Sequence, residues 1–242
     1  MDDSLHREPP FSPRSLMFGH PATIWIVLGT SFALAVAAAL DGGSVLLTWD
    51  EPIQRWVERN RSADLETTFR SFSRMGSNLV VFASFAVIVA FAARRCRALA
   101  IALAVAVLAR PLFEFVIKEL VDRERPDLGR LVPGTGPSHP SGHVLAAVTL
   151  WGLLPPLVAL RTDKRWIWWA TTAVSAVLIA GIAASRMYLG VHWFSDIVQG
   201  FLIGWMYLVL IETLYIRQHE GRRCNGKPLA EDDMATTRPL SS

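Results

Sequence analysis

The chain has 242 residues, of which 52% are hydrophobic, with nine tryptophans, a mean hydropathy of +0.33 and a net charge of +3. It is more apolar than a soluble domain of this length, which indicates an integral membrane protein. Its basic residues occur in short clusters between apolar segments instead of along one surface, and this distribution argues against nucleic acid as a partner.

Six apolar segments are long enough, or nearly long enough, to cross a bilayer. A helix that rises about 1.5 Å per residue needs roughly 20 residues to cross a hydrocarbon core about 30 Å thick. The segments cover residues 21–40, 76–93, 98–117, 144–160, 166–185 and 197–216. We therefore predict an all-α fold, an integral membrane six-helix bundle. Its domain should cover residues 19–218, between disordered cytoplasmic tails at 1–18 and 219–242.

The clusters of Arg and Lys predict how these spans are oriented. Basic residues precede the first span, lie between spans two and three and between spans four and five, and follow span six. All of these places fall on one side of a six-span layout, and the positive-inside rule assigns that side to the cytoplasm. We expect a multi-pass protein of the cell membrane with both termini in the cytoplasm. Cys96 and Cys224 lie on the same side and should stay reduced.

The first apolar segment also has to be distinguished from a cleaved signal peptide. A signal core is usually only about 7 to 15 residues long, and this segment is longer. We therefore expect it to be retained as the first span.

Between the first two spans, residues 44–75 predict short amphipathic helices. Asp50 and Ser62 are suited to cap them, and each helix would have one apolar face. Amphipathic helices of this kind fit a bilayer surface. The pattern leaves two roles open, a cap packed on the bundle or a part of the protein that controls access of the substrate.

Three polar clusters lie at the predicted outer ends of the spans. They are Lys118 with Arg125-Pro126, the sequence Pro140-Ser141-Gly142-His143, and Ser185-Arg186 with His192 and Asp196. Charged and titratable side chains are costly near lipid unless they bind a partner or a ligand. Because all three clusters fall on the same side of the bundle, we expect them to form one site on the extracytoplasmic face.

The residue types in these clusters suit a phosphate group. Arginine can donate two parallel hydrogen bonds to phosphate oxygens, lysine adds a compact charge, and the first amides of a helix favour an anion. The predicted phosphate-binding residues are Lys118, Arg125, Ser141, Gly142 and Arg186.

The two histidines and the carboxylate suggest acid–base and nucleophilic chemistry. His192 and Asp196 are four residues apart and share one face of a helix. Asp196 can therefore accept the Nδ1 proton of His192 and leave Nε2 free as a nucleophile, while His143 remains as a general acid. Zinc is a chemical alternative for two histidines and a carboxylate. The neighbouring cations would repel a dication, so we expect no metal and no other cofactor.

A polar stripe continues inward from Lys118 along the third span. Arg110 and Glu114 precede Lys118 at intervals of four residues. This pair could support the site by orienting Lys118 or by extending the headgroup site. A buried ion pair that fixes helix packing is the other interpretation, because charges inside membranes commonly pair with one another.

The stretches 118–126, 140–143 and 185–196 resemble the signature of the type 2 phosphatidic acid phosphatase superfamily, and every signature position is matched. The resemblance extends over about residues 21–216, including the six-span layout. It implies that His192 forms a phosphohistidine, that Asp196 supports it, and that His143 protonates the leaving group. It also implies a reaction without a metal ion.

We therefore predict a membrane lipid phosphatase of the cell envelope that removes the terminal phosphate of a lipid phosphate or diphosphate. The signature is common to members that act on polyprenyl diphosphates, phosphatidylglycerophosphate and phosphatidic acid. A lipid-linked phosphotransferase using the same site, and a non-enzymatic lipid transporter, are the alternatives. Apart from the lipid substrate and the bilayer, no motif indicates a partner or an oligomeric state.

Overall fold

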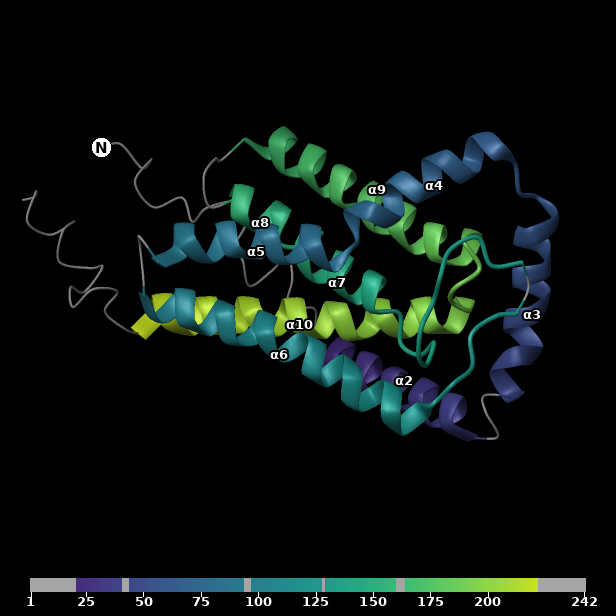
Figure 1. Ribbon diagram of the computed structural model, residues 1–242. Helices are drawn as coiled ribbons and strands as arrows, with labels where there is room; N and C mark the ends of the chain where they lie inside the picture. The colour runs from purple at the N-terminus through teal and green to yellow at the C-terminus, as the bar shows by residue number, and fades with distance from the viewer. Residues whose placement is uncertain (1–20, 41–43, 94–96, 128, 160–163, 222–242) are drawn as a thin grey trace, which may run out of the picture.

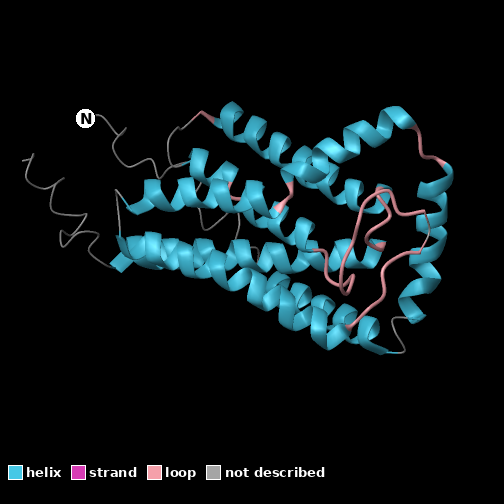
Figure 2. Ribbon diagram, in the orientation of Figure 1, coloured by secondary structure: helices cyan, strands magenta, loops and turns pink. Residues whose placement is uncertain are grey.

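In the computed structural model, the described residues are 21–40, 44–93, 97–127, 129–159 and 164–221, and every regular element among them is an α-helix (Figures 1 and 2). The helices are α2 (Pro21–Ala39), α3 (Ser44–Arg59), α4 (Ala63–Met75), α5 (Asn78–Ala93), α6 (Arg97–Val121), α7 (Gly142–Trp151), α8 (Leu154–Ala159), α9 (Arg165–Tyr188) and α10 (Phe194–Gly221). The predicted all-α fold is confirmed.

Helix α7 forms the centre of the bundle, and its residues from Val144 to Leu150 are buried. Two glycines let α10 pack closely against it. A Cβ atom on Gly200 would lie 2.6 Å from the carbonyl oxygen of Ser141, and one on Gly204 would lie 2.8 Å from that of Leu145. Side chains at these two positions would push the helices apart and separate the segments that carry the second and third polar clusters.

Each predicted span overlaps most of a described helix, although the fourth span is broken. Helix α7 ends at Trp151 and α8 begins at Leu154, so the expected continuous helix over 144–160 is wrong. Pro155 and Pro156 explain the break, because proline has no N–H to donate and its ring clashes with the preceding turn of a helix.

Within the described residues, two helical segments are long and apolar enough to cross a membrane, Arg165–Tyr188 and Phe194–Ile211. Up to four qualify if the bent pairs α2–α3 and α4–α5 each count as one span; their bends are 94° and 40°. Large apolar side chains such as Trp25, Leu112 and Val177 are exposed, as expected for surfaces in contact with lipid. The number of six spans stays a prediction.

The predicted termini lie mostly outside the described residues, as do Cys96 and Cys224. One boundary differs from the expectation. Helix α10 continues to Gly221, so residues 219–221 belong to the helix and not to the predicted tail.

Helices α3 and α4 occupy the predicted amphipathic segment and lie at one end of the bundle (Figure 1). Ser62 caps α4 as expected, because its Oγ accepts a hydrogen bond from the N–H of Leu65 at 3.4 Å. The predicted cap at Asp50 is wrong. Helix α3 begins at Ser44, and the Asp50 carboxylate is buried and bound by Arg123 and Ser195.

Candidate active site

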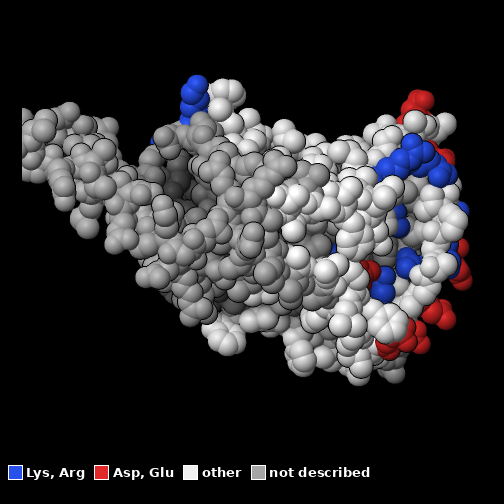
Figure 3. Space-filling model, turned by 60° about the vertical axis from the view of Figure 1, so that its left-hand side comes forward, with Lys and Arg blue, Asp and Glu red and all other residues white. Residues whose placement is uncertain are grey.

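The three polar clusters meet at the end of the bundle where α6 and α9 end and α7 and α10 begin (Figure 1). The backbone N–H of Ser141 donates to the carbonyl of Asp196 at 3.0 Å, and this bond joins the second cluster to the third. The first cluster reaches the third through Arg125, which lies beside His192. Among the described residues, most charged side chains visible in Figure 3 also gather at this end of the molecule.

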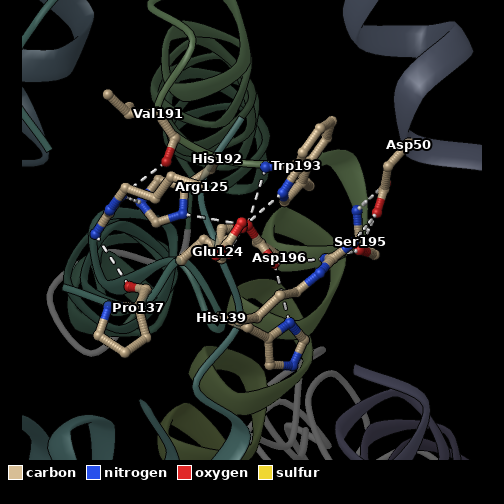
Figure 4. Close-up of polar contacts among 12 residues, drawn as sticks. Asp50, Glu124, Arg125, Pro137, His139, Val191, His192, Trp193, Ser195 and Asp196 are labelled. Carbon is tan, nitrogen blue, oxygen red and sulfur yellow. Dashed lines mark hydrogen bonds and ion pairs between the residues drawn. The ribbon is translucent and has the colours of Figure 1, made fainter. Parts of the chain in front are cut away.

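His192 occupies the loop between α9 and α10 and is buried. Gly190, with φ of +74°, supplies the left-handed backbone conformation that turns the chain there. The Nδ1 atom of His192 lies 3.5 Å from Oδ2 of Asp196, and its Nε2 lies 3.4 Å from Nη1 of Arg125 (Figure 4). The two signature residues therefore lie side by side, but no hydrogen bond joins Nδ1 of His192 to Asp196 at this distance.

The environment of His192 keeps its ring neutral at pH 7. Burial lowers the pKa of His192 to about 4, and the positive charges of Arg186 and Arg125 act in the same direction. The carboxylate of Asp196 opposes this shift without cancelling it. A neutral imidazole has a free electron pair, which a nucleophile needs.

Asp196 is held on both carboxylate oxygens (Figure 4). Its Oδ2 accepts from the backbone N–H of Trp193 at 2.9 Å. Its Oδ1 lies 2.9 Å from Nη1 of Arg123 and 3.1 Å from Nδ1 of His139. Arg123 and His139 were not predicted as site residues, and the only sequence signal for them is their position beside Arg125 and Pro140.

Arg125 lies in the loop after α6, surrounded by backbone carbonyl groups. Its Nε donates to Gly136 at 2.9 Å, and its Nη2 donates to Thr135 and Pro137 at 3.0 and 3.1 Å. Its Nη1 donates to Val191 at 2.7 Å. Burial lowers the pKa of Arg125 from its usual value, although the group is still a cation at neutral pH. The side chain thus ties its own loop to the segment that carries His192.

Arg186 lies in the last turn of α9, where its Nη1 donates to Oγ of Ser73 at 2.6 Å. Its Nε atom is buried and has no hydrogen-bond partner among the described residues. Ser73 belongs to α4, so the predicted amphipathic segment contributes directly to the surroundings of the site.

Ser141, Gly142 and His143 lie at the start of α7. The Oγ of Ser141 is buried without a hydrogen-bond partner in the described part of the chain, and it does not cap the helix. Gly142 packs so closely against the carboxylate of Glu114 that a Cβ atom at this position would overlap Oε1. The ring of His143 faces Gly76, where a Cβ atom would lie 3.5 Å from its Cδ2.

Lys118, Glu114 and Arg110 form a continuous ion-pair ladder on α6. The Nζ atom of Lys118 lies 2.8 Å from Oε1 of Glu114, and Oε2 of Glu114 lies 3.1 Å from Nη1 of Arg110. Arg110 also donates to the carbonyl of Gly142 and to Oδ1 of Asn78, at 3.4 and 3.3 Å. The ladder therefore contacts both a predicted phosphate-binding residue and the neighbouring helices.

The helical fold and its apolar surface are those of a helical membrane protein, with arginines, histidines and a buried carboxylate gathered at one end of the bundle. The PAP2 superfamily matches residues 98–220, and the chain belongs to this family. The resemblance inferred from the three sequence clusters is thereby confirmed.

Two relatives show how far the sequence similarity extends along the chain. Phosphatidylglycerophosphatase B of Bacillus subtilis is 33% identical over 106 residues, which cover 42% of this chain and 50% of the relative. The undecaprenyl-diphosphatase of Sulfolobus acidocaldarius is 27% identical over 186 residues, or 74% of this chain and 85% of the relative. The chain thus spans half the length of the first relative and most of the second.

Solved structures support the same fold. A transmembrane PAP2 type phosphatidylglycerolphosphate phosphatase from Bacillus subtilis superposes with a TM-score of 0.73 at 20% identity, covering 82% of this chain and 98% of that one. LpxE of Aquifex aeolicus gives a TM-score of 0.54 at 23% identity, covering 68% of this chain and 94% of that one.

Proposed function

We propose that this protein is a membrane lipid phosphatase that removes the terminal phosphate of a lipid phosphate or diphosphate through a phosphohistidine at His192. The observation that carries the proposal is the position of the His192 ring. Its Nδ1 faces Asp196 while its Nε2 lies beside the cation of Arg125. A nucleophile oriented by a carboxylate and placed next to a fixed positive charge suits attack on a phosphate.

In the first step, the electron pair of Nε2 forms a bond to phosphorus and the bond from phosphorus to the leaving oxygen breaks. Asp196 stabilises the positive charge that develops on the ring through Nδ1. Lys118, Arg125 and Arg186, with the first amides of α7, neutralise the charge on the phosphate oxygens. His143 donates a proton to the leaving oxygen, which departs as the lipid alcohol or lipid monophosphate. Burial and the neighbouring cations lower the pKa of His143 to about 3 before the phosphate binds. His143 takes up this proton when the negative charge of the bound phosphate offsets those cations.

In the second step, water attacks the phosphohistidine. His143, now neutral, accepts a proton from that water, and the bond between phosphorus and Nε2 breaks. Inorganic phosphate leaves, and both histidines return to their starting states. A lipid-linked phosphotransferase would differ only here, because an acceptor hydroxyl would replace water.

The substrate class follows from the chemistry of the site and from the relatives. Fixed cations favour a phosphate with two negative charges, and the exposed apolar helices would let a lipid tail remain in the bilayer. Relatives named for phosphatidylglycerophosphate and undecaprenyl diphosphate support these lipids as substrates. The last turns of α5 and α8 and the first turns of α6 and α9 lie at the opposite end of the bundle (Figure 1). Basic clusters adjoin these helix ends in the sequence, which supports an extracytoplasmic site.

The experiment is phosphate release by purified protein in EDTA from a polyprenyl diphosphate, phosphatidylglycerophosphate and phosphatidic acid. His192→Ala should abolish both release and the trapping of radioactive phosphate on the protein. His219→Ala makes the same change near the other end of α10 and should leave both intact. Release by His192→Ala at the rate of His219→Ala would refute the proposal, and dependence on an added metal would refute its metal-free form.

A further inference from the structure

A buried charge network behind the nucleophile includes two residues, Asp50 and Arg123, that are not among the signature positions of the family. The guanidinium of Arg123 bridges two carboxylates, with Nη2 2.7 Å from Oδ2 of Asp50 and Nη1 2.9 Å from Oδ1 of Asp196. All three side chains are completely buried. They come from α3, from the loop after α6 and from α10, so the network joins three separate parts of the chain.

Ser195 completes the connection between Asp50 and α10. Its backbone N–H donates to Oδ1 of Asp50 at 2.9 Å, and its Oγ donates to Oδ2 at 2.5 Å. The same Oγ accepts from Nη1 of Arg123 at 2.6 Å. Asp50 therefore binds the first turn of α10 through both carboxylate oxygens, directly beside Asp196.

The buried face of α3 carries polar side chains, among them the charged Asp50. Neighbouring Trp49 and nearby Trp56 are exposed, whereas Asp50 and Gln54, one turn apart, are the buried residues of α3. Burying a carboxylate is unfavourable unless cations and hydrogen-bond donors compensate it. An apolar residue would pack α3 against α10 without that requirement, so packing alone does not account for a carboxylate here.

The network limits the freedom of Asp196. Arg123 and His139 hold its Oδ1, and the N–H of Trp193 holds the Oδ2 that faces His192. With both oxygens bound, the carboxylate cannot rotate away from Nδ1 of His192. A carboxylate that orients a catalytic imidazole works through such fixed geometry.

Building on the proposed role of His192 as nucleophile, we propose that Asp50 and Arg123 are positioning residues for the reaction. Arg123 fixes the Asp196 carboxylate, and Asp50 fixes Arg123 from α3. Through this chain of contacts, the docking of α3 on the bundle sets the orientation and the reactivity of the His192 ring. Neither residue touches the phosphate.

The first test compares Asp50→Asn with Glu51→Gln. Both changes replace a carboxylate of α3 by an amide of the same size, but Glu51 is partly exposed and pairs only with Arg55 among the described residues. Asp50→Asn should slow phosphohistidine formation about 10- to 100-fold, as expected for a residue that supports a catalytic group. The KM and the inhibition constant of inorganic phosphate, which binds the cations without a bond to His192, should stay within about twofold. Glu51→Gln should match the unmodified protein.

A pH profile separates positioning from a general loss of packing. The charged and titratable groups near His192 are Asp196, Arg125, Arg186 and His143, with Arg123, His139 and Asp50 behind Asp196. Asp50→Asn leaves more of the positive charge of Arg123 uncompensated, so the acidic limb of kcat/KM should move to lower pH. Arg123→Gln removes that charge and should move the limb to higher pH. Loss of packing alone would not shift the limb in opposite directions.

Arg123→Lys keeps the charge and provides a second variant if Arg123→Gln does not fold. It should retain more activity than Arg123→Gln, and thermal unfolding in detergent reports the folded fraction of each variant. The inference is overturned if Asp50→Asn forms phosphohistidine as fast as Glu51→Gln. It is also overturned if the loss of activity in Asp50→Asn is no greater than the loss of folded protein. If His192→Ala is inactive while Asp50→Asn is fully active, only the positioning role fails. If His192→Ala remains active, the proposed function fails first.

Discussion

Glu114 holds Lys118 by an ion pair of 2.8 Å between Oε1 and Nζ, one turn apart on α6. Its second oxygen binds the buried Arg110 at 3.1 Å. The two interpretations left open by the sequence, orientation of Lys118 and an ion pair that fixes helix packing, thus use different oxygens of one carboxylate. They can be separated by experiment.

The first prediction concerns Glu114→Gln and the double variant Arg110→Met with Glu114→Met. Glu114→Gln should lower stability by about 3 kcal/mol, because it leaves Arg110 buried without its anion. The double variant removes both charges and should recover most of that loss in thermal unfolding. If Glu114 orients Lys118, the stable double variant should still release phosphate about tenfold more slowly. Release at the normal rate would assign the pair to packing alone.

The second prediction concerns pH. The nucleophile must be neutral, and His192 has its pKa lowered to about 4. The ring of His192 therefore stays mostly neutral down to about pH 5. Because kcat/KM reports the free enzyme, protonation of His192 should lower kcat/KM only as the pH falls through about 4. With an unperturbed histidine as the nucleophile, kcat/KM would already fall near pH 6.5. Nitrogen NMR of histidine-labelled protein, with His192→Gln to assign the signal, measures the same titration without ionisation of the substrate.

An NMR titration of His192 near pH 6.5 would contradict the buried, cation-flanked environment that lowers its pKa. It would also mean that most His192 rings are protonated below about pH 6.5 and have to lose that proton before they attack. The profile of His219→Ala supplies the control, because this residue lies far along α10 from the site.

Much of the site could be predicted because its residues form local patterns. His192 and Asp196 are four residues apart, and that spacing alone places the two side chains next to each other once a helix begins there. The contacts of Asp50 with Arg123 and Ser195 could not be predicted in this way. They join residues 73 and 145 positions apart, and a single carboxylate beside a tryptophan fits a helix cap equally well.

The broken fourth span shows a second limit of the sequence. Its apolar length over 144–160 favours one continuous helix, and length dominated the prediction. Pro155 and Pro156 carried the contrary signal, and the helix is interrupted just before them. Hydropathy reports what a segment is buried in, whereas backbone hydrogen bonding decides whether it is one helix or two.

The third prediction concerns Arg125→Lys. A lysine cannot replace a planar group that donates to Thr135, Gly136, Pro137 and Val191 at once. We expect phosphate release to fall about 100-fold and hydrogen exchange to increase in the loop 129–140. Arg130→Lys is the matched control, because that arginine binds Pro126 and Asp127 within its own turn. Equal exchange in both variants would show that Arg125 does not hold the loop.

The fourth prediction addresses what α4 does, since the sequence left a packed cap and a role with the substrate both open. Ser73 of α4 accepts a hydrogen bond from Arg186 at 2.6 Å, and a hydrogen bond to a charged group contributes about 1.5–3 kcal/mol. Without this hydrogen bond in Ser73→Ala, the guanidinium of Arg186 is no longer held in one orientation. The KM for the lipid phosphate should therefore rise about tenfold, with a smaller change in kcat. Ser71→Ala is the control, because that hydroxyl binds only the carbonyl of Thr67 among the described residues. If both variants keep the same KM, α4 covers the bundle without orienting Arg186. If only Ser73→Ala raises it, the segment between the first two predicted spans forms one wall of the phosphate site.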